Sequence, residues 1–358
     1  MQAGARINTD IRIADFLTLR WAVVAAGLVV GGGVGLYEMF VGHLLATNQV
    51  VVWTTPLISY IFLALASSGI SILVAYGLLR DDRVVVERTR YLLVLDLALL
   101  LGGFTALATE LGSIPNMIHI LLSPNPSSPI WWMGNFYSIK LILVGVKLYR
   151  DVDGRHGGLD RPLAWATLAI AAAATLTLGA VFGTAIARPD FAGAFASLLM
   201  LALALTSGFA WLVVLRRDGA LADHVGGLAR QLSGALAAIL LLKYVYDARA
   251  TTEGLLGWVD PSMPVLFALA ALVAGAVPRI AATVTLIACF GTLYGFVIAG
   301  QRWVFGANTS FFGDVVTFTP NLAEAATLVL GLSVAAALYN LGKLVLLQPG
   351  PGDAPDTP

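Results

Sequence analysis

Residues 52–109 read VWTTPLISYIFLALASSGISILVAYGLL, then RDDRVVVERTR, then YLLVLDLALLLGGFTALAT. The first and third blocks, 52–79 and 91–109, match or exceed the roughly 20 apolar residues with which a helix crosses a bilayer. The block between them, 80–90, is short and rich in arginine. This arrangement predicts a transmembrane hairpin whose basic turn lies on one side of a membrane.

The same alternation continues in both directions along the chain. Apolar runs occupy 21–45, 52–79, 91–109, 130–149, 162–184, 191–215, 229–246, 263–277, 280–300 and 321–347. They predict an all-α integral membrane protein with about ten transmembrane helices. The run 263–277 is short, and little more than Pro278-Arg279 separates it from the next, so eight or nine helices also fit.

The composition agrees with a membrane protein. The chain is 58% hydrophobic and 12% charged, which is far from the usage of soluble domains. A formal net charge of zero argues against a nucleic-acid partner. The single cysteine, Cys289, excludes a disulfide or a cysteine-ligated iron–sulfur cluster within the chain. The polar head before residue 21 lacks a small-residue cleavage site, so we expect the first helix to be retained.

The basic residues indicate orientation. Most of the 21 Lys and Arg residues fall in every second gap between the apolar runs. The alternate gaps hold only Arg188, Arg249 and Arg302, while Lys140 and Lys243 lie inside apolar runs. Because basic loops stay on the cytoplasmic side, both termini are expected in the cytoplasm, with the chain in the inner, or cytoplasmic, membrane.

A weak internal repeat suggests how the helices are grouped. LALASSGIS at 63–71 resembles LALTSGFA at 203–210. We interpret this as two four-helix bundles plus two flanking helices, although small residues also recur simply because helices pack closely through them. The predicted segments are a cytoplasmic N-terminus (1–20), flanking helix one (21–51), the first bundle (52–184), the second bundle (191–300), an outer loop with the last helix (301–347) and a disordered tail (348–358).

Ionisable residues at membrane depth are costly and are candidates for function. Asp96 and Glu110 are separated by nearly four helical turns, so one helix face carries both. Lys140 lies within the next run, and Lys243 lies in the outer half of 229–246. These groups could relay protons. Alternatively, Lys140 forms a structural ion pair with Asp96 or Glu110, and Lys243 extends outward to the interface.

A second set of candidates lies near the outer face. It comprises Glu38, His43, Trp53, Tyr60, His119, Trp131 and Trp132. Aromatic walls with a few proton-exchanging groups suit a quinone head group. An ordinary interfacial aromatic belt is the alternative. The histidines do not face each other from the middles of predicted helices, so we expect no haem, and no metal, in this chain. The outer stretch 114–122 is too short to span and should lie in the interface, and the aromatic loop 301–320 suits a belt or a docking surface.

Four stretches resemble the NrfD/PsrC family, the membrane subunits of polysulfide, tetrathionate and related molybdopterin reductases. They are LLSPNPSSPIWWMG at 121–134, WTTPLISYIFLALASSG at 53–69, LYGFVIAGQ at 293–301 and TPNLAEAATLVLG at 319–331. The resemblance covers about residues 50–345. Two positions depart from the family pattern: Leu293 stands where the family usually has Arg, and Thr177 where it often has Tyr.

The resemblance implies an anchor subunit that binds menaquinone or ubiquinone without haem. It implies a four-cluster iron–sulfur partner and a molybdopterin catalytic subunit on the outer face, with no catalysis by this chain alone. Tyr60 would lie beside the quinone, and Glu110 would be the acidic residue at the outer end of the third helix. The rival hypotheses are a secondary transporter, suggested by the repeat and the buried charges, and a structural anchor that lacks quinone.

Overall fold

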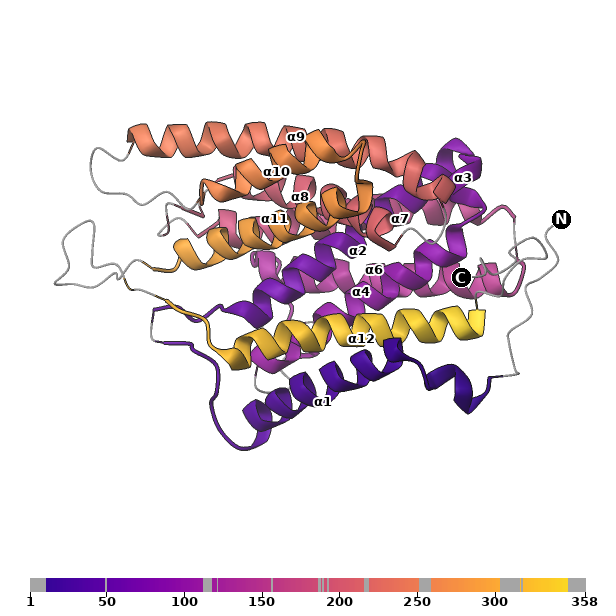
Figure 1. Ribbon diagram of the computed structural model, residues 1–358, viewed down its shortest axis with the longest axis horizontal. Helices are drawn as coiled ribbons and strands as arrows, with labels where there is room; N and C mark the ends of the chain where they lie inside the picture. The colour runs from indigo at the N-terminus through magenta and orange to yellow at the C-terminus, as the bar shows by residue number, and fades with distance from the viewer. Residues whose placement is uncertain are drawn as a thin grey trace.

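The computed structural model describes residues 11–346, with gaps at 49, 112–117, 121, 156, 186–187, 189, 192, 216–218, 251–258, 303–315 and 317. Within those residues the regular structure is entirely helical (Figure 1). The helices are η1 (Ile13–Phe16), α1 (Leu19–Phe40), α2 (Thr55–Arg80), α3 (Arg83–Val86), α4 (Thr89–Glu110), α6 (Pro129–Val152), α7 (Asp160–Gly183), α8 (Phe195–Leu215), α9 (Gly219–Ala250), α10 (Ser262–Val273), α11 (Pro278–Ala299) and α12 (Leu322–Leu346).

The length and composition of these helices confirm a multi-pass, all-α integral membrane protein. In the described part of the chain, eight helices are long and apolar enough to cross a bilayer. Two more, α6 and α10, run alongside them (Figure 1). α6 has 24 residues but carries two buried lysines. α10 has 12 residues and, at 1.5 Å per residue, is about 18 Å long, which is too short to cross alone.

Two predicted boundaries were wrong. The gap 216–230 was expected to be a loop, but α9 begins at Gly219 and continues through it. Hydropathy detects only the apolar part of a helix, whereas a polar extension can stay helical in the headgroup region. The run 263–277 ends as helix at Val273, and α11 starts separately at Pro278. Val277, directly before that proline, is non-helical, as proline disfavours the α conformation in the preceding residue.

α2 is the central helix, and 89% of its most apolar window is buried. α2, α4, α6 and α7 form one closed ring of contacts, and α8, α9, α10 and α11 form another. α2 and α7 both pack against α8, which joins the rings. α12 packs on α4, and α1 packs on α12 at the edge opposite α9 (Figure 1). We interpret the two rings as two four-helix bundles with α1 and α12 as flanking helices.

The two segments of the sequence repeat cross each other where α2 meets α8. A Cβ atom added at Gly69 would overlap the carbonyl oxygen of Ala204, and one added at Gly208 would lie 2.9 Å from the carbonyl oxygen of Ala66. With a larger residue at either position, the two helix backbones could not approach each other so closely. The glycines that mark the repeat therefore also make the contact between the two rings.

Replacing Gly69 by alanine should lower the stability of the folded protein by about 1–3 kcal/mol, because the added methyl group meets backbone that cannot move aside. Gly33→Ala is the matched control, since no atom lies within 4 Å of a Cβ added at that exposed position of α1. Thermal unfolding in mild detergent measures both variants. Equal melting temperatures for the two would contradict the close crossing.

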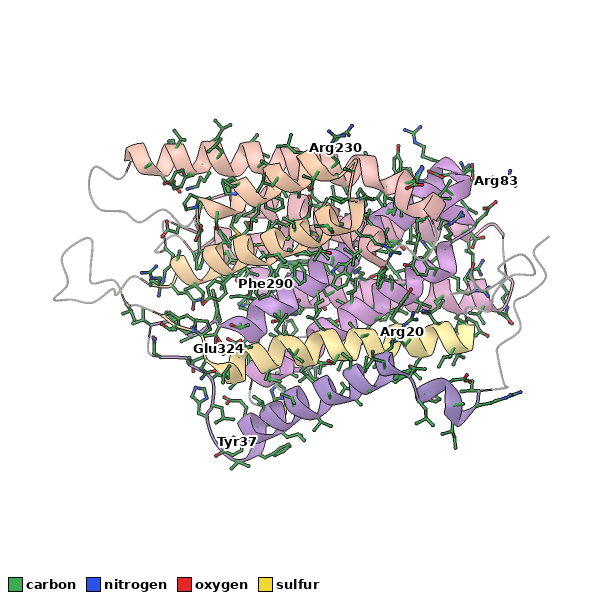
Figure 2. All side chains as sticks on the ribbon, in the orientation of Figure 1. Arg20, Tyr37, Arg83, Arg230, Phe290 and Glu324 are labelled. Carbon is green, nitrogen blue, oxygen red and sulfur yellow. The ribbon has the colours of Figure 1, made fainter. Side chains whose placement is uncertain are left out.

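The helices have two chemically distinct ends. Arg83 lies at one end of the molecule, where α1 begins and α12 stops, and Glu324 and Tyr37 lie toward the other (Figures 1 and 2). We call these the Arg83 end and the Glu324 end. Since α1 and α12 reach the same end, the chain crosses the helical layer an even number of times.

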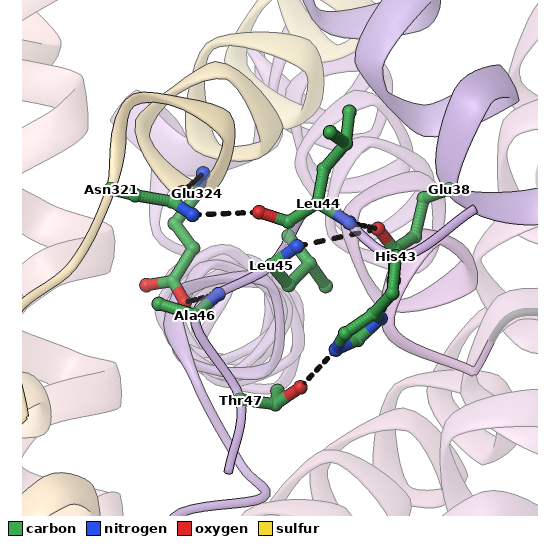
Figure 3. Close-up of polar contacts among 8 residues, drawn as sticks. All are labelled: Glu38, His43, Leu44, Leu45, Ala46, Thr47, Asn321 and Glu324. Atoms are coloured by element: carbon green, nitrogen blue, oxygen red, sulfur yellow. Dashed lines mark hydrogen bonds and ion pairs between the residues drawn. The ribbon is translucent and has the colours of Figure 1, made fainter.

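Polar side chains at the Glu324 end hold the link between α1 and α2. Glu38 accepts the backbone N–H of Leu44 at 2.6 Å, and Asn321 donates to the carbonyl oxygen of Leu44 at 2.6 Å (Figure 3). Glu324 accepts the N–H of Ala46 at 3.0 Å, and its other oxygen accepts the Thr55 hydroxyl at 2.9 Å. These contacts fix where α2 begins.

Candidate functional site

The buried face of α6 is unusual because it is ionisable. Four α6 residues are buried, namely Tyr137, Lys140, Val144 and Lys147. Their spacing of three, four and three residues places them on one stripe of the helix. A stripe that faces neighbouring helices is normally apolar. Here it carries two amines and a phenol into the interior of the first bundle.

Asp96 of α4 and Lys140 form an ion pair at the centre of this bundle. Lys140 Nζ lies 3.0 Å from Asp96 Oδ1, and both side chains are 0% exposed. Ser67 and Ser71 of α2 also donate hydrogen bonds to the Asp96 carboxylate. Lys140 in turn donates to Ser67. Three helices thus contribute to one fully buried polar cluster, which we call the Asp96 cluster (Ser67, Ser71, Asp96, Lys140).

An aromatic layer separates the Asp96 cluster from the Glu324 end. Tyr60 stacks on Phe104 with ring centroids 5.8 Å apart, and its ring meets that of Tyr137 edge-on at 6.0 Å. Lys140 Nζ lies 6.0 Å from the centroid of the Tyr137 ring. The Tyr137 hydroxyl is buried and is within hydrogen-bonding reach of the side chains of Ser68 and Thr175.

Glu110 lies on the far side of the aromatic layer and contacts α2. Its two carboxylate oxygens accept the backbone N–H groups of Thr54 and Leu57, at 2.9 and 2.8 Å. A negative group at a helix N-terminus is favourable because it satisfies free N–H groups and opposes the helix dipole. Of the two ion pairs considered from the sequence, Asp96–Lys140 therefore forms, and Glu110 binds the start of α2 instead.

Trp131 and Trp132, in the first turn of α6, point in different directions. Their ring centroids are 4.8 Å apart. Trp132 is 39% exposed and donates its indole N–H to the carbonyl oxygen of Pro126 at 2.8 Å. The indole N–H of Trp131 is buried and has no partner within the described chain. α6 thus carries a free indole N–H at Trp131 and a buried phenol hydroxyl at Tyr137, with the two backbone positions about 9 Å apart along its axis.

The remaining aromatic candidates are not gathered around Tyr60. Trp53 packs edge-on against Phe182 at 5.5 Å and lies 6.5 Å from Phe191, between the two rings of helices. His119 is exposed in the helical residues 118–120. The predicted cluster near the outer face is therefore divided, with Tyr60 inside the first bundle, Trp53 on its flank and His119 on the surface.

Lys243 belongs to a different part of the molecule. It pairs with Asp247 one turn further along α9, and both side chains are largely buried. α9 packs chiefly against α8 and α10. The structure therefore does not bring Lys243 to the Asp96 cluster.

From the sequence, Lys147 counts among the basic residues of the gap that follows the run 130–149, whereas the structure shows it inside the bundle. Lys147 is 7% exposed, and its amine makes no hydrogen bond to a described residue. It lines a cavity of about 330 Å³ at the Arg83 end, together with Glu87, Asp151 and Asp160. A hydrogen bond from Arg83 lowers the pKa of Glu87, which keeps this carboxylate ionised. The seven-residue spacing from Lys140 is the sequence signal that could have identified Lys147.

Gln301 and Glu324 are the polar residues in two of the family-like stretches, and both have structural partners. Gln301 accepts the N–H groups of Val52 and Trp53 at 3.1 and 2.8 Å and donates to the Trp53 carbonyl oxygen at 2.8 Å. Glu324 holds Ala46 and Thr55, as described above. Together with Glu110, they hold the N-terminal end of α2. The three residues come from α4, from α12 and from the segment directly after α11.

Other predictions fall outside the described residues. The aromatic loop is described only at 301–302, 316 and 318–320, and the tail 348–358 not at all. Within the described residues, no group of three His, Cys, Asp or Glu side chains is arranged to hold a metal ion. His43 contacts Glu38 at 2.5 Å, and His224 lies 2.9 Å from Asp82 at the opposite end.

Comparison with known proteins does not assign a family. No protein-family model matches the chain, and no curated protein matches it.

Proposed function

We propose that this protein is the quinone-reactive membrane subunit of an oxidoreductase complex of the NrfD/PsrC type. The observation that supports it best is the row of ionisable groups through the first bundle, from Glu110, past Tyr60 and Tyr137, to the Asp96 cluster and Lys147. Quinone chemistry couples electron transfer to proton transfer, so a quinone site needs both hydrogen-bond donors and a way to exchange protons. The four stretches that resemble the NrfD/PsrC family are the second argument for this function.

The head group of the quinone would lie near the Glu324 end of the first bundle. Its carbonyl oxygens need donors. Trp131 Nε1 is a buried donor without a partner in the described residues, and the buried Tyr137 hydroxyl would turn from Ser68 or Thr175 to the bound quinone. Tyr60 would add an aromatic wall, since it is already stacked on Phe104. Glu110 would exchange protons with the bound quinone, because its carboxylate lies at the start of α2 and on the same helix as Asp96. Menaquinone and ubiquinone share this chemistry.

Protons would move along the same row toward the Arg83 end. The Asp96 cluster provides a chain of hydrogen bonds over three helices, and Lys147 lies between it and a cavity lined by charged groups. Transfer across the aromatic layer requires water or rotation of the tyrosine hydroxyls. In this proposal the Asp96–Lys140 ion pair both stabilises the fold and forms part of the proton route.

We assign the Arg83 end to the cytoplasm and the Glu324 end to the outer face of the inner membrane, by the positive-inside rule. A four-cluster iron–sulfur protein would dock on the outer loops and pass electrons onward to a molybdopterin subunit.

Cysteine labelling tests the orientation. Cys289 is buried, so an introduced cysteine should be the main reactive thiol. In intact cells a membrane-impermeant maleimide should label Ser123→Cys in the segment before α6, and should label Arg155→Cys only after the cells are opened. Both native residues are exposed, which makes the pair matched. The reverse pattern would overturn the assignment.

Removing the two donors tests the quinone site. Trp131→Phe deletes a donor that has no partner in the described protein, so it should not lower stability appreciably. Tyr137→Phe also removes the contacts of the hydroxyl with Ser68 and Thr175, so its melting temperature is measured alongside. Each should weaken quinone binding by roughly 0.5–1.5 kcal/mol, or about two- to tenfold. Binding is measured by quinone titration of the purified complex. Trp132→Phe is the control, because the Trp132 N–H is already bonded to Pro126. Unchanged affinity in both test variants would reject this site.

A secondary transporter is the second candidate, because its defining features include a repeat and buried charges near the middle of the membrane. The two hypotheses differ in what co-purifies with the chain. An iron–sulfur protein retained in mild detergent supports the redox subunit, whereas proton-coupled uptake by the chain alone in liposomes supports the transporter. If the partner is retained but no quinone binds, the chain is a structural anchor.

A further inference from the structure

A second cavity lies beside α4, and no residue of the Asp96 cluster lines it. It has a volume of about 460 Å³ and is formed by α4, α8, α12 and the start of α1. Its lining residues are Arg20, Leu95, Leu99, Trp211, Leu215, Leu332, Ala335, Ala336, Tyr339, Asn340 and Lys343. The volume lies within the range of small-molecule binding sites. Neither the proposed quinone site nor the proton route uses any of these residues.

The lining has cations at one end and hydrocarbon at the other. Arg20 is the second residue of α1, Lys343 is in the last turn of α12, and Leu215 ends α8, so these residues lie at the Arg83 end. Leu95, Leu99 and Leu332 lie further into the helical layer. Among the described residues that line the cavity, none is acidic. An anion bound there would therefore meet two cations and, among the described lining residues, no carboxylate.

A polar donor lies between these two regions. The indole N–H of Trp211 is buried and has no hydrogen-bond partner in the part of the chain that the structure describes. The amide of Asn340 also lines the cavity. A buried donor beside an apolar wall suits an ester carbonyl oxygen, which is the group that joins a phospholipid headgroup to its acyl chain.

From this order of groups we infer that the cavity binds one anionic phospholipid. Arg20 and Lys343 bind its phosphate, Trp211 Nε1 donates to an ester carbonyl oxygen, and an acyl chain lies along Leu95, Leu99 and Ala336. Basic pockets between transmembrane helices on the cytoplasmic side are known to bind anionic lipid headgroups. The bound lipid would join α1, α4, α8 and α12, and so would tie the flanking helices to the bundles.

Lipid titration of the delipidated, detergent-solubilised complex tests the inference. Phosphatidylglycerol should raise the melting temperature, and native mass spectrometry should detect a retained lipid. The double variant Arg20→Gln/Lys343→Gln should weaken phosphatidylglycerol binding by at least tenfold. Arg83→Gln/Arg279→Gln is the charge-matched control, since both arginines are exposed and neither lines the cavity. Trp211→Phe should weaken binding while leaving both cations in place.

Three results would overturn the inference. The control variant could lose as much affinity as the test variant, which would mean that only the overall charge of the Arg83 end matters. Phosphatidylcholine could stabilise the complex as well as phosphatidylglycerol, which would make the cations irrelevant. A quinone analogue could displace the lipid from the wild-type complex, which would make the cavity a quinone site.

Discussion

Replacing Lys140 by methionine is expected to lower the free energy of unfolding by about 3–5 kcal/mol, because it leaves the Asp96 charge buried without its partner. Both side chains are 0% exposed, so water cannot solvate the remaining carboxylate. Ser67 and Ser71 still donate to Asp96, which limits the loss but does not neutralise the charge. Thermal or denaturant unfolding in detergent gives the measurement.

The double variant Asp96→Asn/Lys140→Met separates the ion pair from the individual residues. It removes both charges, so it should recover most of the stability that Lys140→Met loses. If the single variant is as stable as wild type, then the pair is not charged in the folded protein. If the double variant is stable but proton translocation per electron is unchanged in liposomes, then Asp96 and Lys140 are structural and lie off the route.

Changing Glu110 to glutamine should lower quinone turnover by about 100-fold, the lower range for loss of a general acid or base. Glutamine keeps the shape and one acceptor oxygen for the start of α2, so the fold should survive. The variant cannot take up or release a proton at this position. Quinol-dependent electron transfer by the purified complex is the readout, with the melting temperature measured alongside.

Glu324→Gln is the matched control for Glu110→Gln. Glu324 is also a carboxylate that holds the entry to α2, through Ala46 and Thr55, but it is not on the proposed route. We expect a comparable change in melting temperature and near-normal turnover. Normal turnover in Glu110→Gln would end its role as a proton donor and leave it as a helix cap. An equal loss in both variants would mean that the geometry of α2, and not proton exchange, limits turnover.

The positions of the helices, and which of their ends are basic, could be predicted from the sequence. The free-energy cost of burying a residue in lipid depends mainly on its own side chain. Apolar runs therefore coincide with most of the spanning helices, and the basic gaps coincide with the Arg83 end. The helix face that carries Asp96 and Glu110 was also predictable, since it follows from the helical repeat alone. The structure confirms that both carboxylates contact α2.

Which groups meet across helices could not be predicted, since several pairings satisfy the same local rules. The sequence allowed Lys140 to pair with Asp96 or Glu110, and the packing of α4 and α6 against α2 selects Asp96. Lys147 resembled a loop residue in the sequence, because it lies at the polar end of an apolar run. Whether such a residue is buried depends on the neighbouring helices that pack against it.

The sequence alone is enough to predict a multi-pass bundle of apolar helices, the gathering of most basic residues in alternate gaps and the identity of the charges within the apolar runs. The packing of the helices pairs Asp96 with Lys140, places Glu110 at the start of α2 and keeps Trp53, Tyr60 and His119 apart. Transfer into lipid depends on each segment separately, whereas these contacts depend on how closely the helices approach one another. That approach is set by small residues such as Gly69 and Gly208, where the two rings meet backbone to backbone.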